Sequence, residues 1–184
     1  AAERGTRAAG VTPDRTGARR LTARVARWGS RPDDSAGRPL ALSPPGRVLR
    51  QVAALFGQRL TIDALLALLK HPLVFSGQGG TLGRGAHLIL TREFELHVRR
   101  HGPVFPTAES LAAWAAASPL PGAADWAAIL GDTLCGPVVT DLQPLPKVVA
   151  RHLEVVERLA RGFAAEGTGE VWLEPAGKAA RAAM

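Results

Sequence analysis

The stretch SPPGRVLRQVAALFGQRLTIDALLALLKHP, residues 43–72, decides the fold class. It begins with a helix-start signal, because Ser43 can cap free amide groups and the two prolines after it suit a first helical turn. Apolar residues then recur at three- and four-residue spacing as far as Gly57, which indicates one amphipathic helix. The face that this spacing predicts for the core consists of Val48, Leu49, Val52, Leu55 and Phe56.

A second helix is predicted in the same stretch, between Thr61 and Pro72. Thr61 is expected to cap it, and Pro72 to stop it. The segment between them is apolar nearly all round, and a helix of that kind has to be buried. Its apolar residues are Ile62, Leu65, Leu66, Leu68 and Leu69.

Toward the C-terminus the chain predicts further helices separated by glycine and proline. Residues 76–85, SGQGGTLGRG, contain so many glycines that a mobile loop is expected. A charged helix follows at about 86–100, and later helices centre on Trp114, on Trp126 and on 146–163. Residues 171–184 begin a new element that the end of the sequence interrupts, so the sequence looks like an internal piece of a longer chain.

Toward the N-terminus the pattern changes. The segment RAAGVTPD at 7–14 predicts the end of a strand and a turn, in which Thr12 or Asp14 caps the next helix. In that helix Ala18, Leu21, Val25 and Trp28 share one face, which favours core packing, and Gly29 ends it. A polar loop at 31–40 leads into a short extended piece.

These patterns predict a mixed, mostly α fold. Residues 1–42 are expected to be a strand–helix–strand part of an α/β domain, and residues 43–184 a helical array. No internal repeat is evident. At 184 residues the chain is long enough for one ordinary domain or for parts of two.

The net charge of +7 is concentrated in the first 50 residues, which contain eleven arginines and four acidic residues. Such a concentration attracts phosphate groups and is typical of nucleic-acid contact. The alternative is a solvated basic helix in a chain that is rich in arginine and poor in lysine. The candidate DNA-binding residues lie on the predicted N-terminal helix: Arg15, Arg19, Arg20, Arg24 and Arg27.

The location predicted for the chain is the cytoplasm. No apolar run approaches the roughly 18 to 20 residues that cross a bilayer, and the first residues resemble neither a secretory signal nor a transit peptide. The single cysteine, Cys135, excludes an internal disulfide framework and a multi-cysteine metal site within the segment.

No segment carries a complete catalytic, cofactor or metal motif. The glycine-rich loop lacks the Gly-Lys-Ser/Thr ending of a phosphate-binding Walker loop. His97 and His101 have a spacing that could ligate zinc, but a polar helix end is the favoured interpretation. We do not expect Cys135 to act as a nucleophile. Trp114 and Trp28 are expected to be core residues and not to stack on nucleic-acid bases.

The acidic pairs also have a simple interpretation. Asp33 and Asp34 are adjacent, and Glu93 and Glu95 are two residues apart, so neither pair demonstrates a converging acid/base site. We expect all four carboxylates to be solvated. We therefore predict no catalytic, cofactor-binding or metal-ligating residue in this segment.

Six segments in order resemble the AddB subunit of the bacterial AddAB helicase-nucleases. The first three are VTPDR at 11–15, RRLTARVARWG at 19–29 and DDSAGRPLALSPPGRVL at 33–49. The others are LLALLKHPL at 65–73, TREFELHVRRHGP at 91–103 and GEVWLEPAGKAA at 169–180. The likeness runs through most of the chain, although none of the six is a specific catalytic motif. The chain departs from the family pattern at Gly17, in the glycine-rich loop and at both ends.

The resemblance implies a role in double-strand break repair by homologous recombination. AddB proteins are longer chains with UvrD-like helicase domains that lack working ATPase motifs, followed by a nuclease domain with an iron-sulfur cluster and magnesium. Their partner is AddA, the ATP-dependent helicase subunit. By this resemblance residues 1–42 would belong to a RecA-like domain, and the remainder to a helical insertion.

Three hypotheses for function follow, of which an autonomous small enzyme is the least favoured. In the first, the chain is a non-catalytic DNA-binding and scaffolding segment of a helicase-nuclease subunit. In the second, it is a helical protein–protein interaction module without direct DNA contact, whose partner would be an AddA-type subunit. A membrane partner is not expected. Because the segment has no catalytic motif, the sequence leaves open whether the longer protein is an enzyme.

Overall fold

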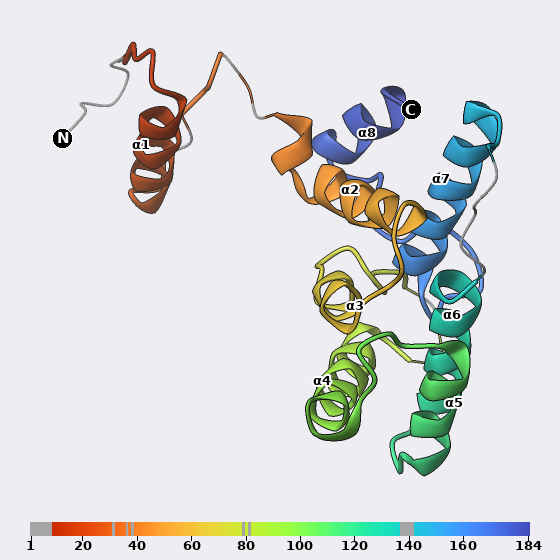
Figure 1. Cartoon of the computed structure of the whole chain (residues 1–184). Helices are drawn as coiled ribbons and strands as arrows, with labels where there is room; N and C mark the ends of the chain where they lie inside the picture. The colour runs from red at the N-terminus through yellow and green to blue at the C-terminus, as the bar shows by residue number, and fades with distance from the viewer. Residues whose placement is uncertain are drawn as a thin grey trace. The chain divides into compact units, whose positions relative to one another are not determined.

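A computed structural model describes residues 9–30, 32–35, 37, 39–78, 80, 82–136 and 142–184. The chain divides into two compact units, Ala1–Arg38 and Pro39–Met184. Within the described ranges every regular element is helical, so the mostly α fold class is confirmed (Figure 1).

The first unit contains one regular element among its described residues, helix α1 (Arg15–Arg27). The predicted strand–helix–strand start of a RecA-like domain is wrong for these residues. Residues 9–12 are exposed and form no ladder with another segment, and a strand needs a neighbouring backbone to satisfy its amides and carbonyls. The expected second extended piece is instead a 3-10 turn, η1 (Leu40–Leu42), in the second unit. Residues 7 and 8 of the predicted first strand lie outside the described residues.

The second unit follows η1 with seven α-helices in its described part. Helices α2 and α3 come from the stretch that decides the fold class, and α5 packs along α6 over much of its length. Helix α2 contacts α3, α7 and α8, while α6 contacts α4 and α7. The bounds are α2 (Pro44–Phe56), α3 (Ile62–Leu69), α4 (Arg84–His101), α5 (Ala108–Ala117), α6 (Ala123–Leu134), α7 (Leu145–Arg161) and α8 (Pro175–Ala182).

Both predicted helix starts in residues 43–72 are confirmed. The Ser43 hydroxyl accepts a hydrogen bond from the amide of Gly46 at 3.2 Å and donates one to the carbonyl of Leu40 at 2.6 Å. The Thr61 hydroxyl accepts from the amide of Ala64 at 3.3 Å. These caps satisfy amides that the first turn of a helix leaves without partners.

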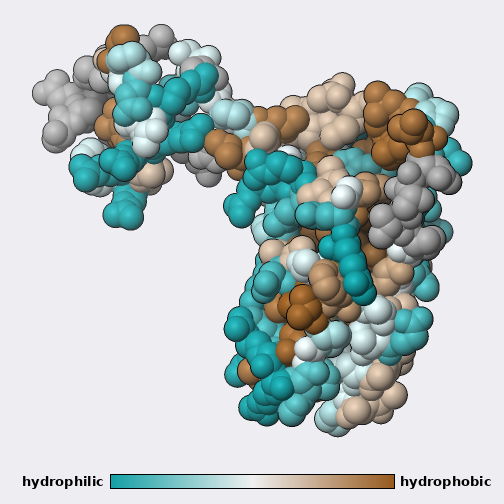
Figure 2. Space-filling view, in the orientation of Figure 1, coloured by the Kyte–Doolittle hydropathy of each residue, from teal (hydrophilic) through white to brown (hydrophobic). Residues whose placement is uncertain are grey.

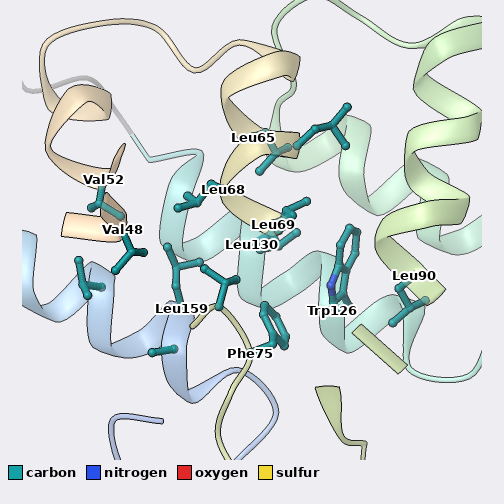
Figure 3. Close-up of a cluster of buried hydrophobic side chains, with 14 of the residues drawn as sticks. Val48, Val52, Leu65, Leu68, Leu69, Phe75, Leu90, Trp126, Leu130 and Leu159 are labelled. Carbon is teal, nitrogen blue, oxygen red and sulfur yellow. The ribbon is translucent and has the colours of Figure 1, made fainter. Parts of the chain in front are cut away.

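The core of the second unit is built around Trp126, which is completely buried. Its ring makes edge contacts with Phe94 and Trp114, whose ring centroids lie 5.6 and 5.3 Å away. Figure 3 shows Trp126 among Phe75, Leu90 and Leu130. The expectation that α3 is buried is confirmed, since Leu65, Leu66, Leu68 and Leu69 all belong to this cluster.

The glycine-rich segment 76–85, for which a mobile loop is predicted, is anchored at its start, and residues 79 and 81 of it lie outside the described residues. The amide of Phe75 donates to the carbonyl of Leu159 at 2.8 Å, and the amide of Gly77 donates to Ala160 at 2.9 Å. A Cβ atom at Gly77 would lie 2.2 Å from the carbonyl oxygen of Arg161. Glycine is therefore needed here for close backbone approach to the end of α7, which composition alone cannot distinguish from flexibility.

Candidate nucleic-acid interface

Helix α1 begins at a well-formed cap. The two carboxylate oxygens of Asp14 accept hydrogen bonds from the amides of Thr16 and Gly17, each at 2.8 Å. The Thr12 hydroxyl accepts from the amide of Asp14 at 3.1 Å, which steadies the residue before the helix. The sequence left Thr12 and Asp14 as alternative caps, and the structure assigns the cap to Asp14.

Gly17 fits this cap rather than weakening the helix. A Cβ atom at this position would lie 2.8 Å from Oδ2 of Asp14, the same oxygen that accepts from the Gly17 amide. Any larger residue would have to displace the capping carboxylate. The glycine at position 17 therefore has a local physical reason.

The candidate DNA-binding arginines all lie on α1 and are exposed. At 3.6 residues per turn, they spread over one half of the helix circumference. Helix α1 contains no acidic residue, and Arg15 donates to the carbonyl of Gly37 at 3.2 Å. No ion pair joins the other four arginines to a described residue. This basic half, made of Arg15, Arg19, Arg20, Arg24 and Arg27, is the candidate site.

The opposite half of α1 is apolar and uncovered within the described part of the first unit. The side chains of Leu21 and Trp28 are 54% and 80% exposed, and α1 has no buried residue. The prediction that Trp28 is a core residue is wrong here, because a helical period shows which residues share a face and not whether another element covers it. Figure 2 shows hydrophilic side chains beside hydrophobic ones over this segment.

The dimensions of α1 suit a nucleic-acid backbone. Thirteen residues give a helix about 20 Å long, and a helix of this diameter enters a DNA major groove about 12 Å wide. Arg24 and Arg27 lie in its last turn, where the helix dipole favours positive charge. The basic half can therefore face several phosphates at once.

The two histidines with zinc-like spacing lie at the end of α4. The ring centroids of His97 and His101 are 6.1 Å apart, both side chains are exposed, and His101 is the last residue of the helix. Together with Arg100 they line a shallow depression between α4 and the end of α5. No group of three or more potential metal ligands converges anywhere in the described residues.

One carboxylate that was expected to be solvated is paired. Glu95 lies 2.7 Å from Nζ of Lys70 and 2.7 Å from Nη2 of Arg99, so it joins α4 to the residue that ends α3. Hydrogen bonds from Lys70 and Arg99 hold the pKa of Glu95 below its usual range. Asp33 and Asp34 are exposed, as expected. Glu95 therefore has a structural role.

The structure also places the remaining candidate side chains. Trp114 is buried in the core, with its ring centroid 5.2 Å from that of Phe94, so the prediction of core packing is confirmed. Cys135 is half-buried, and burial, followed by the negative charge of Glu109, raises the pKa of its thiol. A thiol with a raised pKa is a poor nucleophile at neutral pH.

Comparisons with protein-family models, with curated proteins and with solved structures returned no match. The resemblance to AddB subunits therefore stays a prediction from the six segments of the sequence. Among the described residues, no helix combines the length and the apolar character that crossing a membrane would require.

Proposed function

We propose that the chain is a non-catalytic DNA-binding and scaffolding segment of a cytoplasmic helicase-nuclease subunit of the AddB type, which acts in double-strand break repair by homologous recombination. In this proposal the basic half of α1 contacts the phosphate backbone, and the helices of the second unit provide a rigid scaffold. The observation that carries the proposal is the set of five exposed arginines on a helix without an acidic residue.

The physical support for DNA contact is electrostatic. Positive side chains that neutralise phosphates release condensed counterions, and this release drives much of protein–DNA binding at low salt. Arg19, Arg20 and Arg24 need not break an existing ion pair before they contact a phosphate, because none joins them to a described residue. A contact of this kind positions the protein without reading the base sequence.

The apolar half of α1 favours a second candidate function, docking on a partner protein. Leu21 and Trp28 are exposed at neighbouring positions on one face, and exposed tryptophan is common at the centre of protein interfaces. An AddA-type helicase subunit would be the partner under this candidate. The two functions use opposite halves of α1, so substitutions can separate them.

The test measures binding of the chain to a labelled duplex end as a function of salt. The variant Arg19→Gln, Arg20→Gln, Arg24→Gln removes three charges from the basic half. We expect the slope of log K against log salt to become shallower by about 2 to 3, since each lost phosphate contact contributes about 0.9. Affinity at low salt should fall by at least about tenfold.

The matched control removes three exposed charges from the second unit, with Arg92→Gln, Arg100→Gln, Arg181→Gln. We expect it to retain the original slope. A second variant, Leu21→Ser, Trp28→Ser, tests the apolar half and should leave DNA binding unchanged. If the basic-half variant and the second-unit control change the slope equally, the assignment of DNA contact to α1 is wrong. If only the apolar-half variant loses capture of an AddA-type subunit, protein docking is the better function.

A further inference from the structure

A cavity of about 320 Å³ lies in the second unit, and none of the residues that line it belongs to the candidate DNA interface. The last turns of α2 and α6 and the first turn of α5 come together there beside α7 (Figure 1). This volume is at the lower end of the roughly 300–1,000 Å³ typical of small-molecule sites. The cavity is therefore large enough for a small organic ligand.

About half of the cavity wall is apolar. Its apolar residues include Val52 and Leu55 of α2, Val155 of α7 and Leu134 at the end of α6. Val52 is completely buried, so the floor of the cavity belongs to the core. An apolar group placed here would be removed from water, which favours binding by about 25 cal/mol for each Å² that it buries.

Two arginines provide the positive charge of the cavity. The guanidinium carbon of Arg59 lies 4.1 Å from the centroid of the Phe105 ring, and that of Arg151 lies 5.7 Å from the Phe56 ring. Stacking on an aromatic face restrains a guanidinium while leaving its N–H groups available for hydrogen bonds. Neither arginine forms an ion pair with a described residue.

The other ionisable groups of the cavity wall do not fully neutralise the positive charge of the two arginines. Glu109 is the acidic residue of the lining, and hydrogen bonds from its own backbone amide and from Thr107 hold its pKa below the usual range. Its carboxylate therefore already has hydrogen-bond donors. Cys135 is neutral, because burial and Glu109 raise the pKa of its thiol. Among the described residues of the lining, Arg59 and Arg151 against Glu109 give a net charge of +1.

We propose that this cavity binds a small organic monocarboxylate with an apolar body. Its carboxylate accepts hydrogen bonds from Arg59 and Arg151, and its apolar body lies against Leu55, Leu134 and Val155. A guanidinium suits this role because its planar N–H groups match the two oxygens of a carboxylate. A cationic ligand of the same size would meet a cavity of like charge.

Cys135 allows binding to be measured at this position, because it is the only cysteine of the chain and lies on the cavity wall. The experiment follows the rate of Cys135 alkylation by iodoacetamide on the full chain, with decanoate as the probe. Decanol and decyltrimethylammonium, both below the concentrations at which they aggregate, serve as neutral and cationic probes of the same chain length. Isothermal titration calorimetry of decanoate gives stoichiometry and affinity independently.

We expect decanoate to bind with a stoichiometry of one and to slow alkylation in a saturable manner. Decanol and decyltrimethylammonium should bind at least about tenfold more weakly, since neither can accept the pair of charge-assisted hydrogen bonds. Arg59→Gln and Arg151→Gln should each weaken decanoate binding by about tenfold, close to the effect of losing one charge-assisted hydrogen bond. The control Arg92→Gln, an exposed arginine outside the cavity, should bind decanoate like the original chain.

Equal protection by decanoate and decanol would overturn the proposal, and so would decanoate binding that both arginine variants leave intact. Because the two arginines are exposed, these variants should keep the fold, which circular dichroism checks. The conservative variants Arg59→Lys and Arg151→Lys retain the charge and should recover part of the affinity. Failure here leaves the DNA-binding proposal untouched, since that proposal concerns α1 alone.

Discussion

The indole N–H of Trp126 donates a hydrogen bond to Nδ1 of His87 at 3.0 Å, between α6 and α4. Because Nδ1 accepts, the proton of the neutral imidazole is on Nε2, which donates to the carbonyl of Leu69 at 2.8 Å. The ring of Phe75 stacks on the imidazole with centroids 4.2 Å apart. His87 thus links the end of α3 to α4 and α6 in one neutral protonation state.

The first prediction concerns pH. Burial lowers the pKa of His87 from 6.5 to about 4. The unfolded chain therefore binds a proton near pH 6.5, whereas the folded chain does so only near pH 4. Stability contributed by the neutral imidazole is complete above pH 6.5 and is lost as the pH falls toward 4. Between pH 7 and pH 5 we expect the free energy of unfolding to fall by roughly 2 kcal/mol from His87 alone.

Urea unfolding at a series of pH values measures this fall. Burial and the charges of Arg47 and Arg84 likewise lower the pKa of His71 to about 4, so its effect has the same sign. The exposed residue His97 provides a control, since His97→Gln should leave the pH dependence unchanged. A free energy of unfolding that stays constant between pH 7 and pH 5 would contradict the prediction.

The second prediction separates the Trp126 hydrogen bond from ring packing. Trp126→Phe removes the donor to His87 and leaves Nδ1 buried without a partner. Trp114→Phe makes the same chemical change at a core tryptophan that contacts the same aromatic cluster. We expect Trp126→Phe to lower the free energy of unfolding by about 1 to 3 kcal/mol more than Trp114→Phe, the cost of an unsatisfied buried acceptor. Equal losses in chemical denaturation would show that packing alone matters at both positions.

The third prediction concerns the residue that ends α7. Gly162 has φ = 60°, and a Cβ atom there would lie 2.5 Å from Cδ1 of Phe75. Gly162→Ala therefore combines backbone strain with a clash and should cost about 2 kcal/mol or more. Gly57 ends α2 at φ = −102°, and a Cβ atom there would meet open space, so Gly57→Ala should be nearly neutral or stabilising. Thermal unfolding of the two variants compares them, and similar melting temperatures would refute the argument.

The features that could be predicted from the sequence depend on residues that are close together in the sequence. Ser43 and Thr61 cap helices through amides three residues away, so the pattern that identifies them lies within one helical turn. The core face of α2 follows from spacing in the same way. Trp126 and His87 are 39 residues apart, and no local pattern shows that a tryptophan in one helix will donate to a histidine in another.

The candidate sites show the same limit. The arginines of α1 were identified from charge and spacing, whereas the exposure of Trp28 depends on what covers the helix, which its period does not encode. Arg59 and Arg151 lie 92 positions apart in the sequence and line the same cavity because α2 packs on α7. A run of glycines can indicate either a flexible backbone or close approach of two backbone segments. Only the position of the α7 backbone beside Gly77 shows that close approach applies there.

The cap at Asp14 also constrains how a nucleic acid could approach α1. The amino end of a helix is ordinarily attractive to phosphate, because its free amides point outward. Here both carboxylate oxygens of Asp14 already occupy the amides of Thr16 and Gly17. A bound duplex would therefore contact the side of the helix that carries the arginines, and its phosphates would not contact the N-terminal end of the helix.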